Sequence, residues 1–446
     1  MSPKREGPLE RALTLRRVRD FSIAIFAVNV VLYAVVIARG HFPFDALGMA
    51  VLPDFIAHLT GGTLALHRDL AHLYDIDAQS NVQQAITHDP HFLDLYISPP
   101  LASLLYAPFA RLPYALAAAA WTCVTLALLF LSARTIRTLT PSLPRSHRDV
   151  MLVAAMASQP VIQLLGSGQD TAISLLLWSS GVALALERRD AAAGLVMSLG
   201  LFKPQLFVLP PLMFLALRRK RAIGAWVTGA LAQAALTLVV FGPSALQGWW
   251  RILQSPEYRV FLRVDRAMRM TSIMPFIDSV LPHGIGVVQA AGWLLGAALS
   301  LAVVVATLWR SLPGETREAL DERGAWALAC FATLLASPHL FYYDMTLLAL
   351  PVALLVEIRT TLGAREKGAL VAIYLLTWTA AVRAGLESAA WPLRVVAASW
   401  TAIPLFYLWR VVPTRKSAPG ALPWGALDTP LRSRLDSAPL DADTPH

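Results

Sequence analysis

Charged residues are scarce in this chain. Asp, Glu, Lys and Arg make up only 15% of the 446 residues, whereas 56% are hydrophobic. Soluble globular domains carry about 25% charged residues, so this composition excludes an ordinary soluble protein and indicates an integral membrane protein. At about 20 residues per crossing, the apolar residues suffice for on the order of a dozen transmembrane helices. Little of the chain is then left for a separate soluble domain.

The short motifs of several familiar chemistries are also missing. The sequence holds no P-loop, no dinucleotide-binding Gly-x-Gly-x-x-Gly, no Cys-x-x-Cys, no His-Glu-x-x-His and no Gly-x-Ser-x-Gly. Energy from a cytoplasmic nucleotide is therefore not expected. The only cysteines, Cys123 and Cys330, lie inside apolar runs, which gives no indication of a disulfide framework. His67 and His72 are five residues apart and miss the usual same-face spacing of metal ligands, so we expect no metal cofactor.

Basic residues set the predicted orientation. Residues 1–20 contain six of them ahead of a first apolar run that is too long for a cleaved signal core. By the positive-inside rule the N-terminus is cytoplasmic, and the net charge of +9 reflects cytoplasmic loops rather than a nucleic-acid partner. We predict twelve spans, and because this number is even, the C-terminus is also cytoplasmic. They are 21–39, 114–133, 150–165, 170–186, 191–202, 204–217, 222–241, 286–309, 325–336, 344–357, 368–383 and 391–410.

The predicted fold is therefore an all-α polytopic membrane domain over residues 21–410. Spans such as 191–202 are too short to cross alone and predict helices that stop part-way beside a cavity. Residues 98–113 hold four prolines and predict an interfacial or re-entrant segment instead of a continuous helix. Residues 411–446, rich in Pro, Ser and Asp, predict a disordered cytoplasmic tail.

Two large segments face outward in this scheme, residues 40–97 and 242–285. The first predicts two short interfacial helices separated at Gly61, because Pro53 suits a first turn and glycine commonly ends a helix. Asp54 and His58 are four residues apart and would share one helix face. Asp54 is then either a functional carboxylate or only a group that complements the helix N-terminus.

Polar residues interrupt apolar runs at three further places on the predicted outer side. Lys203 stands where two short apolar helices meet, and an anionic phosphate is its natural partner; the alternative is that its side chain reaches to lipid headgroups. Gln169 and His339 lie in the other two interruptions, the segments Gly166–Asp170 and Ser337–Asp344, which also hold Asp170 and Asp344. These two aspartates are explained equally well as caps of helix ends.

The segment 242–285 opposes the orientation rule because it is rich in arginine. Arg259 and Arg263 predict contacts to an anionic lipid phosphate, since a guanidinium binds phosphate with two hydrogen bonds. Non-specific binding to phospholipid headgroups is the alternative.

The order of these pieces resembles glycosyltransferase family 87. This family includes polyprenol-phosphate-mannose-dependent α-1,2-mannosyltransferases with a membrane-embedded GT-C fold. The sequence departs from the family's pattern at Ser98, where tyrosine is common, and at Asp170, where asparagine is frequent. The matching pieces are Asp54-Phe55, Ser98 to Leu101, Pro108 to Pro113, Gly168-Gln169, Ala193-Gly194, Lys203 to Gln205 and Ser337 to Asp344.

The resemblance implies a GT-C fold and an inverting transfer of a hexose. Mannose would move from a polyprenyl-phosphate donor to a hydroxyl of a glycan or glycolipid acceptor, on the outer side of a bacterial cytoplasmic membrane. Asp54 would be the general base, and His339 would hydrogen-bond or protonate the leaving phosphate. Lys203, with Arg259 or Arg263, would stabilise the phosphate charge. The remaining predicted substrate contacts are His58, Gln169 and Tyr342.

Two other classes of function fit a polytopic protein with broken helices. A flippase or transporter of lipid-linked sugars would place ionisable groups near the membrane midplane, whereas here they collect at the outer helix ends. An O-antigen-like polymerase or ligase would carry a larger arginine-rich outer loop, which only residues 242–285 approach.

Overall fold

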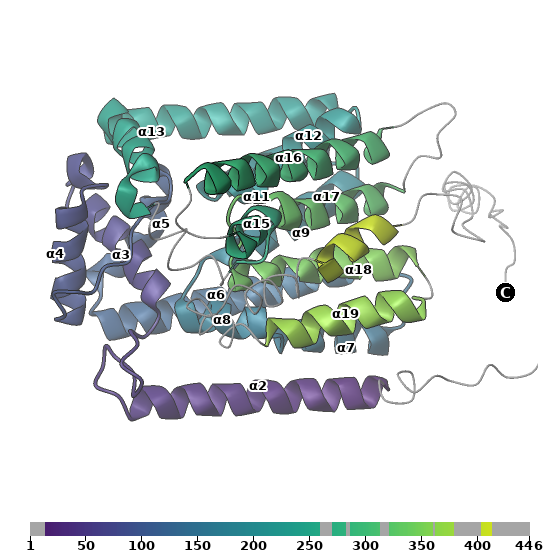
Figure 1. The fold of residues 1–446 in the computed structure, drawn as a ribbon, viewed down its shortest axis with the longest axis horizontal. Helices are drawn as coiled ribbons and strands as arrows, with labels where there is room; N and C mark the ends of the chain where they lie inside the picture. Colours follow the sequence, from purple (N-terminus) through teal and green to yellow (C-terminus); the bar gives the residue numbers. More distant parts are fainter. Residues whose placement is uncertain are drawn as a thin grey trace, which may run out of the picture.

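The computed structural model describes residues 14–258, 270–281, 286–312, 321–359, 362–378 and 403–412. These residues form helices and turns without a β-strand (Figure 1), which confirms the all-α prediction. The α-helices are α2 (Leu15–Ala38), α3 (Pro53–Leu66), α4 (Ile76–Thr87), α5 (Ser103–Tyr106), α6 (Tyr114–Thr138), α7 (Arg145–Met156), α8 (Gln159–Ser167), α9 (Thr171–Leu186), α10 (Asp190–Ser198), α11 (Pro204–Phe207), α12 (Leu209–Ala216), α13 (Lys220–Gln254), α15 (Ile273–Val280), α16 (Gly286–Ser311), α17 (Glu322–Ala336), α18 (Ala349–Ile358) and α19 (Ala364–Thr377). The 3₁₀ segments are η1 (Leu70–His72), η2 (Pro100–Ala102), η3 (Phe109–Arg111), η4 (Leu199–Phe202) and η6 (Tyr342–Leu348).

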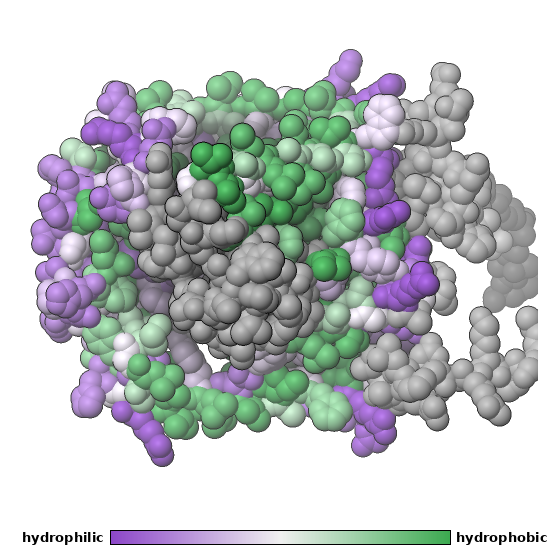
Figure 2. All heavy atoms as spheres, in the orientation of Figure 1, coloured by the Kyte–Doolittle hydropathy of each residue, from purple (hydrophilic) through white to green (hydrophobic). Residues whose placement is uncertain are grey.

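On the face shown in Figure 2, the coloured side chains in the middle are mostly hydrophobic, and hydrophilic ones gather at the two ends. This banding is what a protein embedded in a bilayer requires. Among the described residues, four helices are long and apolar enough to cross a membrane: α2, α6, α13 and α16. The pair α7 and α8, bent by 46°, makes a fifth candidate. The predicted count of twelve is therefore not confirmed, and residues 379–402, which hold parts of two predicted spans, lie outside the described ranges.

The start of α2 and the helical residues 403–410 lie at the same end of the molecule, opposite α3, α4 and α5 (Figure 1). At that end the buried guanidinium of Arg219 binds Asp190 at 2.9 Å and Glu322 at 2.5 Å. Because Arg219 directly precedes α13, these ion pairs connect the N-terminal ends of α10, α13 and α17. Which end faces the cytoplasm stays a prediction.

The first helix begins earlier than predicted. α2 starts at Leu15, so part of the predicted N-terminal tail, 1–20, is helical. The hydroxyl of Thr14 accepts the backbone N–H of Arg17 at 3.4 Å and caps the helix. Arginine is also a good helix former, so the basic residues that precede the apolar run extend the helix. Apart from Val411 and Val412, the predicted tail lies outside the described residues.

Gly61 does not end a helix, contrary to prediction. α3 runs without interruption through Gly61 and Gly62 to Leu66. A Cβ atom at Gly61 would lie 2.6 Å from the ring of Tyr96, and one at Gly62 would lie 2.6 Å from the backbone of Tyr106. The two glycines therefore allow neighbouring segments to approach α3 closely, which is a long-range packing role that the local pattern does not reveal.

We expect Gly61→Ala to lower the free energy of unfolding by about 1–3 kcal/mol, because the added methyl group meets the Tyr96 ring. Gly224→Ala is the matched control, since no atom lies within 4 Å of its Cβ position in α13. The control should be neutral or stabilise by up to about 1 kcal/mol through helix propensity. Thermal unfolding in detergent measures both. Equal stability of Gly61→Ala and the wild type would contradict this packing role.

Part of the predicted outer segment 242–285 is helical. α13 bends at Gly242, whose φ of 74° and ψ of 173° an L-residue rarely adopts, and continues through Pro243 to Gln254. After the bend, α13 turns toward α3 and α4 (Figure 1), where the indole of Trp249 donates to the carbonyl of Ile97 at 2.8 Å. The other connection, 98–113, forms η2, α5 and η3 rather than one helix, as its prolines predicted.

Candidate functional site

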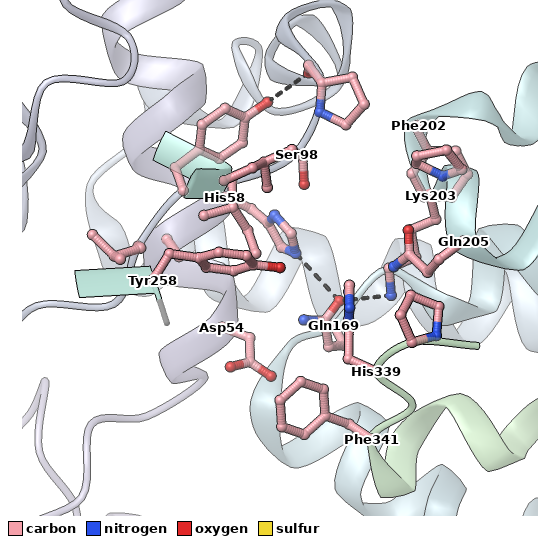
Figure 3. A pocket seen from close by; sticks show the side chains of 18 of the residues that line it. Asp54, His58, Ser98, Gln169, Phe202, Lys203, Gln205, Tyr258, His339 and Phe341 are labelled. Carbon is pink, nitrogen blue, oxygen red and sulfur yellow. Dashed lines mark hydrogen bonds between the residues drawn. The ribbon is translucent and has the colours of Figure 1, made fainter. Parts of the chain in front are cut away.

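A cavity of about 540 Å³ opens at the end of the molecule that holds α3 and α4. One wall comes from α3, the extended residues 94–99 and the end of α13 with Tyr258 (Figure 3). The other wall comes from residues 202–205 and 338–344. Gln169 lies between the two walls. The polar interruptions of apolar runs that were predicted to lie on one side of the membrane therefore contribute to one cavity.

Asp54 lies in the first turn of α3, directly after Pro53 at the helix start. Its half-buried carboxylate points into the cavity near Phe341 (Figure 3). Within the described ranges, this carboxylate makes no hydrogen bond or ion pair, and it does not cap α3. A carboxylate that the protein leaves without a partner in a cavity is available to accept a proton from a bound molecule.

His58 follows one turn later in the same helix, at the spacing that predicted a shared face with Asp54, and it lines the same cavity. Its imidazole stacks on the Tyr106 ring at 4.6 Å between centroids. The Nε2 atom lies 3.3 Å from Oε1 of Gln169 and 3.8 Å from Oδ2 of Asp170. His58 therefore connects the Asp54 side of the cavity with the polar groups opposite.

Lys203 is surrounded by acceptors from three distant parts of the chain. Its Nζ atom lies 2.7 Å from Oδ1 of Asp170 and 3.3 Å from Oδ1 of Asp344. It also donates to Gln169 Oε1 and to the hydroxyl of Thr171, both at 3.1 Å. An ammonium has three protons, so these four acceptors satisfy it without a bound ligand. With both carboxylates ionised, one cation faces two anions, and this cluster carries a net charge of −1.

The two carboxylates of this cluster are held from their other sides as well. The Tyr106 hydroxyl donates to Asp170 at 2.8 Å, and the Thr171 hydroxyl donates to Asp344 at 2.6 Å. Asp170 precedes α9 but makes no side-chain cap there, which argues against a role as a helix cap alone. Asp344 does accept the backbone N–H of Phe341 at 3.3 Å.

The local sequence explains why these groups stand at chain breaks. α8 ends at Ser167 and is followed by Gly168, whose φ of 75° is left-handed and whose Cβ, if present, would lie 2.6 Å from Phe55 of α3. Pro204 starts a new helix and leaves Lys203 in a non-helical conformation. Both breaks place a polar side chain, Gln169 or Lys203, in the cavity wall.

His339 lies in the connection between α17 and η6 and lines the cavity. Burial lowers the pKa of its imidazole to about 4, so the ring is neutral at physiological pH. Tyr342 was the predicted substrate contact, but it is buried away from the cavity, and Tyr343 lines it instead. Successive residues of a 3₁₀ segment point about 120° apart, so only one of the two rings can face the site.

The structure thus brings Asp54, His58, Gln169, Lys203 and His339 to one cavity. Arg259 and Arg263 lie outside the described residues. In the described part of the chain, no group of three or more His, Cys, Asp or Glu side chains is arranged to hold a metal ion. Sequence reasoning missed Tyr106, Thr171 and the cavity-lining residues 94–97. Tyr106 and Thr171 are uncharged and do not interrupt an apolar run, and the role of residues 94–97 depends on how they pack against α4.

Comparison with known proteins gives a family and one relative. A family model described as Glycosyltransferase family 87 matches residues 96–338, which is more than half of the chain. A relative from Mycolicibacterium smegmatis is named polyprenol-phosphate-mannose-dependent alpha-(1-2)-phosphatidylinositol mannoside mannosyltransferase. It is 28% identical over 280 residues, covering 57% of this chain and 60% of its own length. The chain therefore spans about three fifths of the length of that relative. No solved structure matches this chain.

Proposed function

Because the chain belongs to glycosyltransferase family 87, we propose that it transfers a hexose from a polyprenyl-phosphate donor to an acceptor hydroxyl. The observation that carries the proposal is the carboxylate of Asp54, which faces the cavity without a partner among the described residues. Mannose is the proposed sugar because the relative's name specifies a polyprenol-phosphate-mannose donor and a mannoside acceptor.

In the proposed reaction Asp54 is the general base. The acceptor oxygen attacks the anomeric carbon while Asp54 takes the hydroxyl proton. The bond between the anomeric carbon and the phosphate oxygen breaks, and polyprenyl phosphate leaves with the bonding electrons. One displacement inverts the anomeric centre, so a β-linked donor yields an α-linked product.

Lys203 has a positioning role in this proposal. Its ammonium is already bound by Asp170, Asp344, Gln169 and Thr171, so its main effect is to fix those groups at the cavity wall. This differs from the predicted direct contact between Lys203 and the donor phosphate. Arg259 and Arg263 remain the proposed cationic partners of the phosphate.

His339 is proposed to donate a hydrogen bond to the leaving phosphate. Since its pKa of about 4 keeps the imidazole neutral, an N–H donor fits the site better than a general acid. The reaction is placed on the outer side of the bacterial cytoplasmic membrane, with both termini in the cytoplasm. The basic N-terminal residues support this orientation.

The test is a transfer assay with the purified protein in liposomes. Radiolabelled polyprenyl-phosphate-mannose and a mycobacterial lipid extract are supplied, and GDP-mannose replaces the lipid donor in a parallel reaction. The proposal predicts a labelled product from the lipid donor only. Movement of intact labelled donor between leaflets, without any labelled product, would favour a flippase instead.

A sharper prediction concerns the neighbouring tyrosines 342 and 343. The Tyr343 hydroxyl accepts from Gln169 at 3.2 Å, and Lys203 lies 5.5 Å from the centre of its ring. We expect Tyr343→Phe to raise the donor KM up to about tenfold, because Gln169 loses one hydrogen bond and its orientation. Tyr342→Phe should leave the donor KM unchanged, because Tyr342 does not line the cavity. The reverse ranking of the two variants would contradict this assignment.

A further inference from the structure

Two glutamine side chains of α4 hold residues 94–96 in place. Each side-chain amide binds both the N–H and the C=O of one backbone residue, as a neighbouring β-strand would. The amide of Gln83 donates to the Asp94 carbonyl at 2.6 Å and accepts the Asp94 N–H at 2.8 Å. One turn earlier, Gln79 donates to the Tyr96 carbonyl at 3.2 Å and accepts the Tyr96 N–H at 2.8 Å. Both glutamines are fully buried. Two bidentate contacts therefore fix the backbone of this short segment.

The opposite edge of the segment has no such partner. In an extended chain the N–H and C=O groups of alternate residues point to opposite edges, so Leu95 and Ile97 present theirs away from Gln79 and Gln83. The Ile97 carbonyl accepts from Trp249 at 2.8 Å. Among the described residues, the Leu95 N–H, the Leu95 carbonyl and the Ile97 N–H have no hydrogen-bond partner. Both residues line the cavity, and Leu95 is only 6% exposed.

Buried backbone groups without a partner are rare, because each one costs about as much as a lost hydrogen bond. Here two donors and one acceptor belong to Leu95, which is buried, and Ile97, which is half-buried, and both residues line the cavity that also holds Asp54. A ligand with hydroxyl groups can bind both the backbone N–H donors and the carbonyl acceptor, since each hydroxyl donates one hydrogen bond and accepts others.

The geometry points to an acceptor subsite at the backbone edge of Leu95 and Ile97, where neighbouring hydroxyls of a sugar acceptor bind. This inference rests on the proposed transferase function and names where the acceptor sits. This edge offers three backbone hydrogen-bonding groups over residues 95–97. It ends at Ile97, whose carbonyl is already bound by Trp249, so the edge is too short to pair with a peptide strand. The wall that carries Asp54 thus also carries the acceptor, while Lys203 and His339 stand on the other wall (Figure 3).

The test removes the edge donors with proline, which lacks a backbone N–H. The probe is octyl α-D-mannoside below its micelle concentration, and its binding to the full chain in nanodiscs is measured without turnover. Leu95→Pro and, separately, Ile97→Pro should weaken binding about three- to tenfold, while the affinity for farnesyl-phosphoryl-mannose stays unchanged. Leu93→Pro is the matched control, because Leu93 lies on the same edge but outside the cavity.

A second measurement varies the probe and begins with the unchanged protein. Octyl mannosides that each lack one hydroxyl are compared on the wild type, and at least one should bind three- to tenfold more weakly. That difference should shrink in Leu95→Pro. Equal binding of all deoxy probes, no binding of the parent probe to the wild type, or equal losses in Leu93→Pro and Leu95→Pro would overturn the subsite. A wild type that binds the probe but transfers no sugar would instead contradict the proposed function alone.

Discussion

Replacing Asp54 by asparagine is expected to slow sugar transfer by about 100- to 10,000-fold, the usual contribution of a general base. The amide keeps the size of the side chain but cannot take the acceptor proton. Because the Asp54 carboxylate makes no hydrogen bond or ion pair within the described ranges, its replacement removes no contact that stabilises the fold. The variant should therefore unfold at the wild-type temperature and bind the donor with wild-type affinity.

Asp77→Asn is the matched control for this prediction. Asp77 also stands in the first turn of a helix, α4, but it is exposed and does not line the cavity. Its substitution should leave the transfer rate unchanged. Transfer by Asp54→Asn at a near wild-type rate would contradict the assignment of Asp54 as the base.

Replacing Lys203 by methionine has the largest expected effect on stability. The substitution leaves Asp170 and Asp344 buried without their cation, and breaking a buried ion pair by removing one partner costs about 3–5 kcal/mol. We expect the free energy of unfolding, measured in detergent, to fall by that amount. The exposed Lys220→Met is the control and should change stability little.

A triple variant separates charge from packing at this cluster. Adding Asp170→Asn and Asp344→Asn to Lys203→Met removes all three charges, so much of the lost stability should return. If Lys203→Met instead keeps wild-type stability and only raises the donor KM, Lys203 contacts the donor phosphate directly. That result would contradict the positioning role.

Those features of the site that depend on local sequence patterns could be predicted. The four-residue spacing of Asp54 and His58 predicted that both lie on one helix face, and both side chains line the cavity. The charge of Lys203 within an apolar stretch also marked it as unusual. Its partners were not predictable, since Asp344 is 141 residues away and no local pattern encodes that pairing.

The features that the local sequence did not predict have the same physical origin. Gly61 carries the local signature of a helix end, but its lack of a side chain serves contact with Tyr96, which is distant in sequence. Tyr342 and Tyr343 are chemically alike, and only the 3₁₀ geometry of η6 decides which ring reaches the cavity. The clamp of Gln79 and Gln83 on residues 94–96 likewise depends on how two separate segments pack.

The most direct test of the account is the anomeric configuration of the product. Purified protein is incubated with β-linked polyprenyl-phosphate-mannose carrying ¹³C at the anomeric carbon, and the product is examined by NMR. The account predicts an α-linked mannoside from the wild type and almost none from Asp54→Asn. A β-linked product, or full product formation without the Asp54 carboxylate, would contradict a single displacement assisted by that base.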